Sequence, residues 1–124
     1  MTFAEADLSA IAGAEEVRIE TRAADGTTHR TIIWIVEHDG QLYIRSVNGP
    51  DARWYREATA DTAIALLVGD QRFEAHVVPA TDPASIEACS AGLRAKYKAD
   101  YSLASMLKPE TLPTTLRVVP VVPA

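Results

Sequence analysis

The sequence predicts a mainly β fold of the α+β type, a small antiparallel barrel with about three helices on its outside. Two patterns predict it. Short segments that are apolar or that alternate between apolar and polar residues recur along the chain. Pairs of aspartate and glycine separate several of them and favour tight hairpin turns: Asp25-Gly26, Asp39-Gly40 and Gly69-Asp70.

The N-terminal half is predicted to hold a short helix and a meander of three strands. Residues 3–12 form the helix, and residues 17–22 alternate as a half-buried strand. The Asp25-Gly26 turn leads into a longer, more apolar strand over residues 28–37, and Asp39-Gly40 returns the chain along residues 41–47. If pairing runs outward from this second turn, Arg30 comes close to Ser46.

The C-terminal half is predicted to hold two helices and three strands. Asp51 can cap a helix that runs to Ala58. Strands follow over residues 62–68 and 71–78, and Asp82-Pro83 then opens a helix that ends near residue 98. Prolines confine the last strand to residues 114–119, at an edge or closing position of the sheet.

Length and composition indicate one compact domain over residues 1–124, because 48% of the residues are apolar and 23% are charged. No apolar run reaches the length of a membrane span, and acidic residues follow Met1, so we expect a cytoplasmic protein with no membrane partner. A net charge of −5 argues against nucleic acid as a partner. Residues 29–56 carry four arginines against three acids, a local +1 that leaves −6 elsewhere, so the central segment is where we expect an anion.

No self-sufficient catalytic motif is visible. His29, His38 and His76 lie on separate strands or turns without the spacing of metal ligands, so the sequence predicts no metal site. Cys89, the single cysteine, falls on one helix face with apolar residues and is predicted to be buried rather than reactive.

The turn between residues 43 and 55 holds the strongest candidate for a ligand site. Arg45 and Ser46 end a strand, where backbone N–H groups become free and a guanidinium fork matches phosphate oxygens. Asn48 adds a neutral hydrogen-bonding group, and Trp54 can lie over the turn. Trp34, on an otherwise apolar strand, is predicted to serve packing instead.

Three stretches carry a resemblance to a known superfamily: Thr28-His29-Arg30-Thr31-Ile32-Ile33-Trp34, Leu42-Tyr43-Ile44-Arg45-Ser46 and Asn48-Gly49-Pro50-Asp51-Ala52-Arg53-Trp54-Tyr55-Arg56. They resemble the flavin- and deazaflavin-binding split β-barrels, and in particular the deazaflavin-dependent nitroreductases. A little-characterised bacterial family of stand-alone domains of this length is more similar still, from residue 17 to residue 119.

The resemblance implies a six-stranded antiparallel split β-barrel, commonly a homodimer, that binds FMN or a deazaflavin (coenzyme F420). It also implies a role for six residues. Five would meet the phosphate or the ribityl chain and the sixth would border the ring: Arg30, Thr31, Arg45, Ser46 and Asn48, then Trp54. The lysines that the nitroreductases place near the phosphate are missing, because Lys96, Lys98 and Lys108 all come late in the chain.

Three functions remain open at this point. The first is a flavin- or deazaflavin-dependent oxidoreductase of a small hydrophobic substrate, in which the cofactor carries the chemistry and no protein nucleophile is needed. The second is a module that binds a small ligand or cofactor without turnover. The third is a cofactor-free barrel recruited to a biosynthetic reaction. One fold hosts many chemistries, so fold alone does not rank them.

Overall fold

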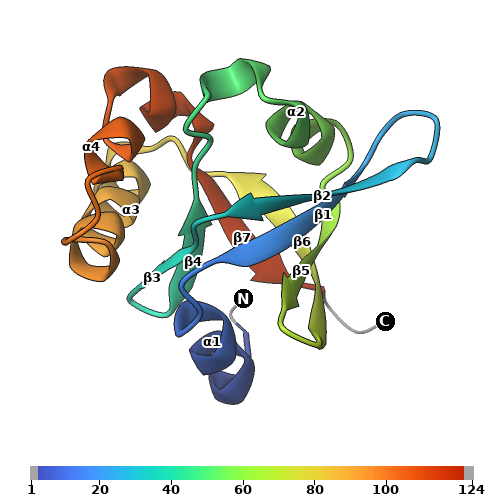
Figure 1. Ribbon diagram of the computed structural model, residues 1–124, viewed down its shortest axis with the longest axis horizontal. Helices are drawn as coiled ribbons and strands as arrows, with labels where there is room; N and C mark the ends of the chain where they lie inside the picture. Colours follow the sequence, from blue (N-terminus) through green and yellow to red (C-terminus); the bar gives the residue numbers. More distant parts are fainter. Residues whose placement is uncertain (1–2, 122–124) are drawn as a thin grey trace.

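The computed structural model describes residues 3–121. Seven strands form one antiparallel sheet in the order β2-β1-β5-β6-β7-β4-β3, and helices surround it (Figure 1). The strands are β1 (Val17–Arg22), β2 (Thr28–Ile33), β3 (Val36–His38), β4 (Gln41–Ile44), β5 (Ala63–Val68), β6 (Gln71–Pro79) and β7 (Leu116–Pro120). The helices are α1 (Glu5–Ala12), α2 (Arg53–Ala60), α3 (Pro83–Lys96) and α4 (Leu103–Met106), with short 3-10 helices η1 (Gly49–Asp51) and η2 (Pro109–Thr114).

The sheet curls into a barrel that is split between its two edge strands. These edges, β2 and β3, are consecutive in the chain and are joined by Trp34 and Ile35. The mainly β, α+β class is therefore confirmed, with seven strands instead of six. The predicted strand over residues 28–37 is wrong as one element, because the chain must leave its ladder with β1 before it can pair with β4 on the far side of the split.

The predicted neighbourhood of Arg30 and Ser46 is also wrong. The Asp39-Gly40 turn does set a short hairpin register, with His38 opposite Gln41 and Val36 opposite Tyr43. Before the break, however, β2 pairs with β1 and places Arg30 opposite Glu20. The hairpin geometry thus ends before it reaches Arg30.

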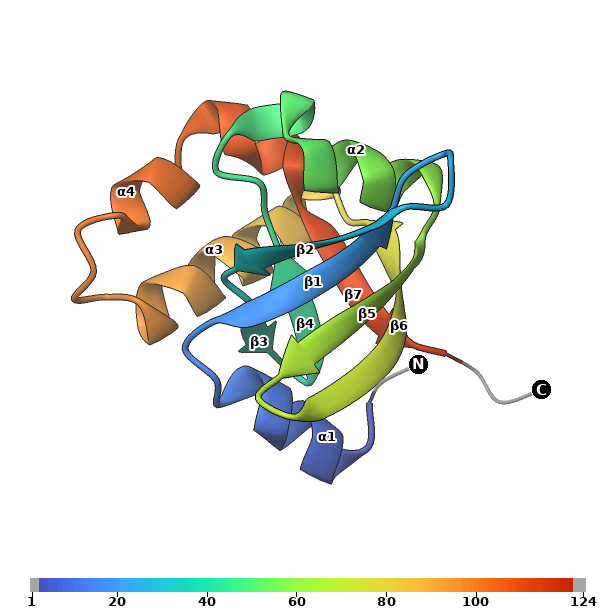
Figure 2. The same ribbon diagram turned by 45° about the vertical axis from the view of Figure 1, so that its right-hand side comes forward.

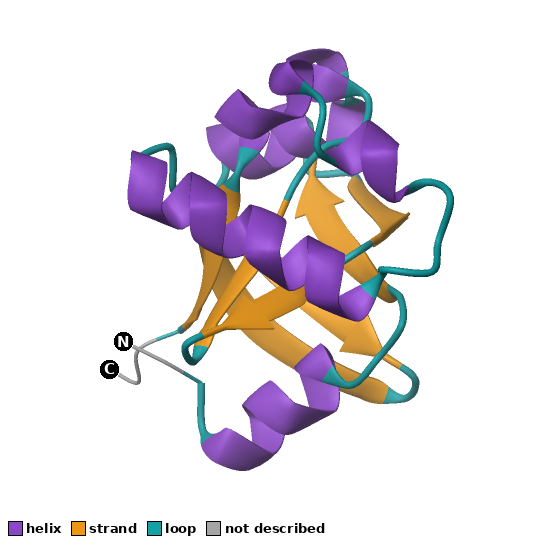
Figure 3. Cartoon of the chain, turned by 90° about the vertical axis from the view of Figure 1, so that its left-hand side faces the viewer, coloured by secondary structure: helices purple, strands orange, loops and turns teal. Residues whose placement is uncertain are grey.

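Two apolar clusters hold the molecule together. The first fills the barrel with buried side chains from six strands and includes Ile19, Leu66 and Val118. The second lies between α3 and the sheet, and Figure 3 shows α3 lying across the outside of the barrel. Helix and sheet approach closely at Gly92, where an added Cβ would lie 2.9 Å from Val36 Cγ2.

Cys89 belongs to this second cluster and is 1% exposed, which confirms the prediction of a buried cysteine. Burial raises the pKa of its thiol to about 11. At neutral pH the side chain is therefore a protonated, apolar packing group.

The two helix caps predicted from sequence have different outcomes. At α3 the Asp82 carboxylate accepts a 3.0 Å hydrogen bond from the backbone N–H of Ser85, as predicted. At α2 the predicted Asp51 cap is wrong, because Gly49–Asp51 forms a 3-10 turn of its own and Ala52 occupies the N-cap without a side-chain bond. Within residues 3–121, no helix has the length and apolar character needed to span a membrane.

Candidate functional site

A cleft of about 340 Å³ opens where the end of β2 faces the start of α2 and the segment around α4. We call it the β2–α4 cleft. Four of the six residues predicted from sequence line it: Thr31, Arg45, Asn48 and Trp54. They come from β2, from the end of β4, from the turn before η1 and from α2, so the split in the barrel is what brings them together.

The structure does not bring Arg30 or Ser46 to the wall of this cleft. Arg30 follows the strand alternation to the opposite face from Thr31, where its Nε donates a 3.1 Å hydrogen bond to Glu20 Oε1. Ser46 is buried, and its hydroxyl donates to the Gly49 carbonyl at 2.6 Å. Its backbone N–H donates to Thr114 Oγ1 at 3.0 Å, so this serine shapes the turn that carries Asn48.

Arg45 is the largest side chain of the chain's described part that is almost fully buried, at 2% exposure. Its guanidinium donates three hydrogen bonds to neutral oxygens: to Thr115 Oγ1 at 2.8 Å, to the Met106 carbonyl at 3.2 Å and to the Ile86 carbonyl at 2.8 Å. Burial lowers the pKa of this guanidinium, which nevertheless stays charged. Among residues 3–121, no carboxylate forms an ion pair with it, although Glu16 lines the same cleft.

Thr31 supplies a buried hydroxyl group at this wall. Its hydroxyl oxygen is buried and has no hydrogen-bond partner in the part of the chain that the structure describes. A buried hydroxyl without a partner costs about 1–3 kcal/mol of stability. Such a group is therefore expected where a ligand or a bound water completes the bond.

Two indoles line the cleft with flat apolar surface. Trp34 stacks on Tyr97 with 3.9 Å between ring centroids and 7° between planes, and Trp54 meets Tyr55 edge to face at 6.0 Å. The stack on Trp34 agrees with its predicted packing role, but the same residue also lines the cleft. Trp54 is 7% exposed and reaches from the core to the cleft wall.

Tyr97, on which Trp34 stacks, and its neighbour Lys96 both form hydrogen bonds to backbone carbonyl groups. Lys96 Nζ donates a 2.7 Å hydrogen bond to the Ile35 carbonyl, and the Tyr97 hydroxyl donates to the Glu15 carbonyl. Burial lowers the pKa of Lys96 to about 8 and raises that of Tyr97. The indole is thus held between the sheet and the end of α3.

Sequence reasoning missed the part of the cleft contributed by the α4 segment. Ser102, Ser105 and Met106 line the cleft from this side. The spacing of the two serines, three residues apart, places them on one face of a helical turn, which was the available signal. The rest of the wall is formed by Glu16, Ile32, Ile33 and Val47.

Chemically, the β2–α4 cleft combines a buried cation, a free hydroxyl, an exposed amide and two indoles. This set can bind an anion and a flat ring. Among residues 3–121, no three His, Cys, Asp or Glu side chains are grouped so that they could hold a metal ion.

The sequence profile of one protein family matches residues 7–118. That family is described as an uncharacterized protein conserved in bacteria, DUF2255. No match was found among curated protein sequences.

Several solved structures share the fold at low sequence identity. Rv2991 from Mycobacterium tuberculosis, a conserved hypothetical protein, has a TM-score of 0.74 at 16% identity, over 98% of this chain and 83% of the other. An F420-H2 dependent reductase, FDR-A, has a TM-score of 0.62 at 17% identity, over 84% and 93%. HutZ, the heme storage protein from Vibrio cholerae, has a TM-score of 0.67 at 9% identity, over 99% and 93%. These likenesses establish the split-barrel fold.

Proposed function

The chain belongs to this bacterial family, DUF2255, and on that premise we propose that it is a flavin- or deazaflavin-dependent oxidoreductase that acts on a small hydrophobic substrate. The β2–α4 cleft is the proposed cofactor site. The single observation that carries the proposal is the buried Arg45 guanidinium, which lines this cleft without an acidic partner among the described residues. The likeness of the fold to an F420-H2 dependent reductase supports the same assignment.

The charge argument is the first support. Taking a cation out of water costs several kcal/mol unless opposite charge or hydrogen bonds compensate it. In Arg45, hydrogen bonds to three neutral oxygens compensate in part, and the phosphate of a bound cofactor would supply the missing negative charge. Arg45 is then both a brace of the fold and a source of positive potential for the cleft.

The shape and lining of the cleft are the second support. Its volume of about 340 Å³ lies in the range of small-molecule sites, about 300–1,000 Å³. Thr31 and Asn48 would hydrogen-bond the polar chain of the cofactor, and Trp34 and Trp54 would flank its ring. Met106 and Ile32 would keep water from the ring face. FMN or a deazaflavin, when bound, supplies the hydride chemistry, so these residues need only bind, orient and exclude water.

Titration of the purified protein with FMN and with coenzyme F420, followed by quenching of tryptophan fluorescence, tests the proposal. We expect saturable binding of one of them, with quenching reduced in Trp54→Phe and in Trp34→Phe because both indoles line the cleft. Asn48→Ala is expected to weaken binding roughly two- to tenfold by removing a neutral hydrogen bond. Gln71→Ala, an equivalent loss of an exposed amide on β6, is the matched control.

The outcomes separate the three candidate functions. Binding together with reduction of an electron-acceptor dye supports the oxidoreductase. Binding without turnover supports a binding module, the function to which the fold shared with a heme storage protein points. If neither compound binds, the oxidoreductase proposal is wrong and a cofactor-free reaction in this cleft takes its place.

We also propose that the protein is a homodimer in which a second copy covers the mouth of the β2–α4 cleft. Ile32 and Val47 line this cleft and are 62% and 44% exposed. Ile32 lies on β2, an edge strand with an unpaired side, and such edges are usually covered. Light scattering after size exclusion tests the proposal: we expect twice the 13.4 kDa monomer mass, and a monomer for Ile32→Glu. A monomeric wild type would contradict it.

A further inference from the structure

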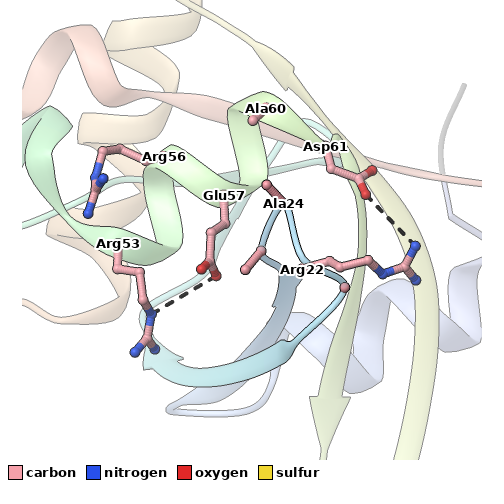
Figure 4. A pocket seen from close by; sticks show the side chains of 9 residues that line it. Arg22, Ala24, Arg53, Arg56, Glu57, Ala60 and Asp61 are labelled. Carbon is pink, nitrogen blue, oxygen red and sulfur yellow. Dashed lines mark ion pairs between the residues drawn. The ribbon is translucent and has the colours of Figure 1, made fainter.

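A second cleft, of about 500 Å³, lies between α2 and the loop that joins β1 to β2. Figure 2 shows this loop beside α2, and Figure 4 shows the cleft from close by. We call it the hairpin cleft. On one side it is lined by Arg22, at the end of β1, and by Ala23, Ala24 and Gly26 of the loop. On the other side it is lined from α2 and its C-terminal end by Arg53, Arg56, Glu57, Ala60 and Asp61. None of these residues lines the β2–α4 cleft.

We propose that the hairpin cleft binds a small organic anion that carries more than one carboxylate or phosphate group. Three of its lining residues are arginines and two are acids, a local charge of +1 on a chain whose net charge is −5. The rest of the chain carries a net −6, so the hairpin cleft has a charge opposite in sign to that of the remainder, which favours an anion here.

The hydrogen-bonding capacity of the three arginines is largely unused. Arg53 Nε lies 4.0 Å from Glu57 Oε1, and Arg22 Nη1 lies 3.8 Å from Asp61 Oδ2, both too long for hydrogen bonds (Figure 4). Arg56 Nε donates a 3.1 Å bond to the Asp51 carbonyl, which leaves its two Nη groups without a partner in the described part of the chain. Guanidinium forks with free donors are the groups that bind carboxylates and phosphates in pairs.

Glu57 makes its hydrogen bonds to the sheet and only a long ion pair, of 4.0 Å, to Arg53. Its Oε1 accepts a 2.7 Å hydrogen bond from Thr21 Oγ1, and His29 Nδ1 lies 3.1 and 3.0 Å from its two oxygens. Burial alone would raise the pKa of Glu57, but the hydrogen bonds from Thr21 and His29 have the larger combined effect and lower it. The group is therefore a carboxylate at neutral pH. This carboxylate is tied to the sheet beneath the helix, while the Arg53 side chain stays 52% exposed.

Small side chains leave the space that a ligand needs. Ala23 and Ala24 from the loop and Ala60 from α2 extend no further than a methyl group into the hairpin cleft. A volume of about 500 Å³ is in the range of small-molecule sites rather than of a single simple ion. Two or more anionic groups would let one ligand engage guanidinium groups on both sides of the cleft.

The test is a titration of the full chain with citrate and, separately, with inorganic pyrophosphate, followed by amide chemical shifts in NMR. We expect saturable shifts at residues 22–26 and 53–61, with an affinity that falls as sodium chloride is raised. Citrate and pyrophosphate distinguish a carboxylate ligand from a phosphate ligand. Neither probe carries a ring, so their failure would overturn this proposal without touching the cofactor assignment of the β2–α4 cleft.

The test is made specific by variants that are expected to change the affinity for the anion in opposite directions. Arg53→Gln and Arg56→Gln should each weaken binding about three- to tenfold, and Glu57→Gln should tighten it because a negative charge leaves the wall. Arg94→Gln is the matched control, since Arg94 is an exposed arginine on α3 that lies on the other side of the barrel and is paired with Glu87 (Figure 1). Absence of saturable shifts, or an equal loss in Arg94→Gln, would overturn the proposal.

Discussion

Arg45 Nε donates a 2.8 Å hydrogen bond to Thr115 Oγ1, a residue 70 positions later in the chain. This bond joins the end of β4 to the residue before β7, and further bonds from the same guanidinium reach α3 and α4. One arginine therefore fixes four elements around the β2–α4 cleft. Its position gives it two roles, a structural one and a proposed ligand-binding one, that experiment can separate.

Arg45→Ala should lower the free energy of unfolding by about 3 kcal/mol or more, because it leaves buried acceptors unpaired and opens a cavity. It should also weaken cofactor binding by about 1.5–3 kcal/mol through loss of a charge-assisted contact. Urea unfolding measures the first effect, and titration at a temperature where the variant is folded measures the second. Arg94→Gln, with an exposed side chain, should change stability by less than about 1 kcal/mol. Lower stability with unchanged cofactor affinity would leave Arg45 with a structural role alone.

Thr31→Val is expected to change stability and binding in opposite directions. The substitution removes a buried hydroxyl that lacks a partner in residues 3–121, so the free protein should keep its stability or gain up to about 1 kcal/mol. Cofactor affinity should fall roughly two- to tenfold, because the hydroxyl is the group proposed to bond the ligand. Thermal unfolding and cofactor titration measure the two effects.

The control for Thr31→Val is Thr21→Val, which removes a hydroxyl that does have a partner. Thr21 Oγ1 donates to Glu57 Oε1 at 2.7 Å, so this variant should lose about 1.5–3 kcal/mol of stability. Equal destabilisation by both variants would show that the Thr31 hydroxyl is satisfied in the free protein.

Lys96 should make stability depend on pH between about 8 and its unfolded pKa of about 10.4. Burial lowers the folded pKa to about 8, so within this window the unfolded chain binds the proton and the folded chain does not. The unfolding free energy contributed by Lys96 therefore rises with pH through the window and is lost as pH falls toward 8.

Urea unfolding of the wild type and of Lys96→Met at about pH 7.5 and about pH 9.5 measures this contribution. Cys89 and Tyr97 titrate in both proteins, so the difference between the two isolates Lys96. We expect the wild type to gain stability relative to the variant as pH rises. A constant difference for Lys96→Met would contradict the burial of this ammonium group.

The strands could be predicted because alternation is a local property of the chain. In β6, Ala75 and Val77 are buried and His76 between them is only partly buried, which is the alternation expected of a strand. The break between β2 and β3 could not be predicted this way, because Trp34 and Ile35 fit an apolar strand as well as their neighbours do. The strand ends there because the sheet is curved, and the other strands that produce this curvature lie far away in the sequence.

Part of the candidate site could likewise be predicted from local sequence, and part could not. Arginine, serine, asparagine and tryptophan around one turn indicated a place for an anion and a ring, and Thr31, Arg45, Asn48 and Trp54 do line one cleft. Strand alternation places Arg30 and Thr31 on opposite faces of β2, so at most one of them can lie in the cleft. Which one does so depends on which face of the strand the cleft adjoins, and only the tertiary structure shows that. Ser102 and Ser105 come from a segment more than fifty residues beyond Asn48, and no local pattern connects it to the turn.

Periodicity, backbone preference and charge act over a few residues, so the order of amino acids was enough to predict the class of fold, the turns, the buried cysteine and the region rich in arginine. Tertiary structure alone decided that Arg45 is buried without an acid among the described residues, that Glu57 is held by Thr21 and His29, and that two clefts lie at opposite ends of β2. Burial and hydrogen-bond partners depend on segments that meet only when the barrel closes, which is why they could not be predicted from the order of residues.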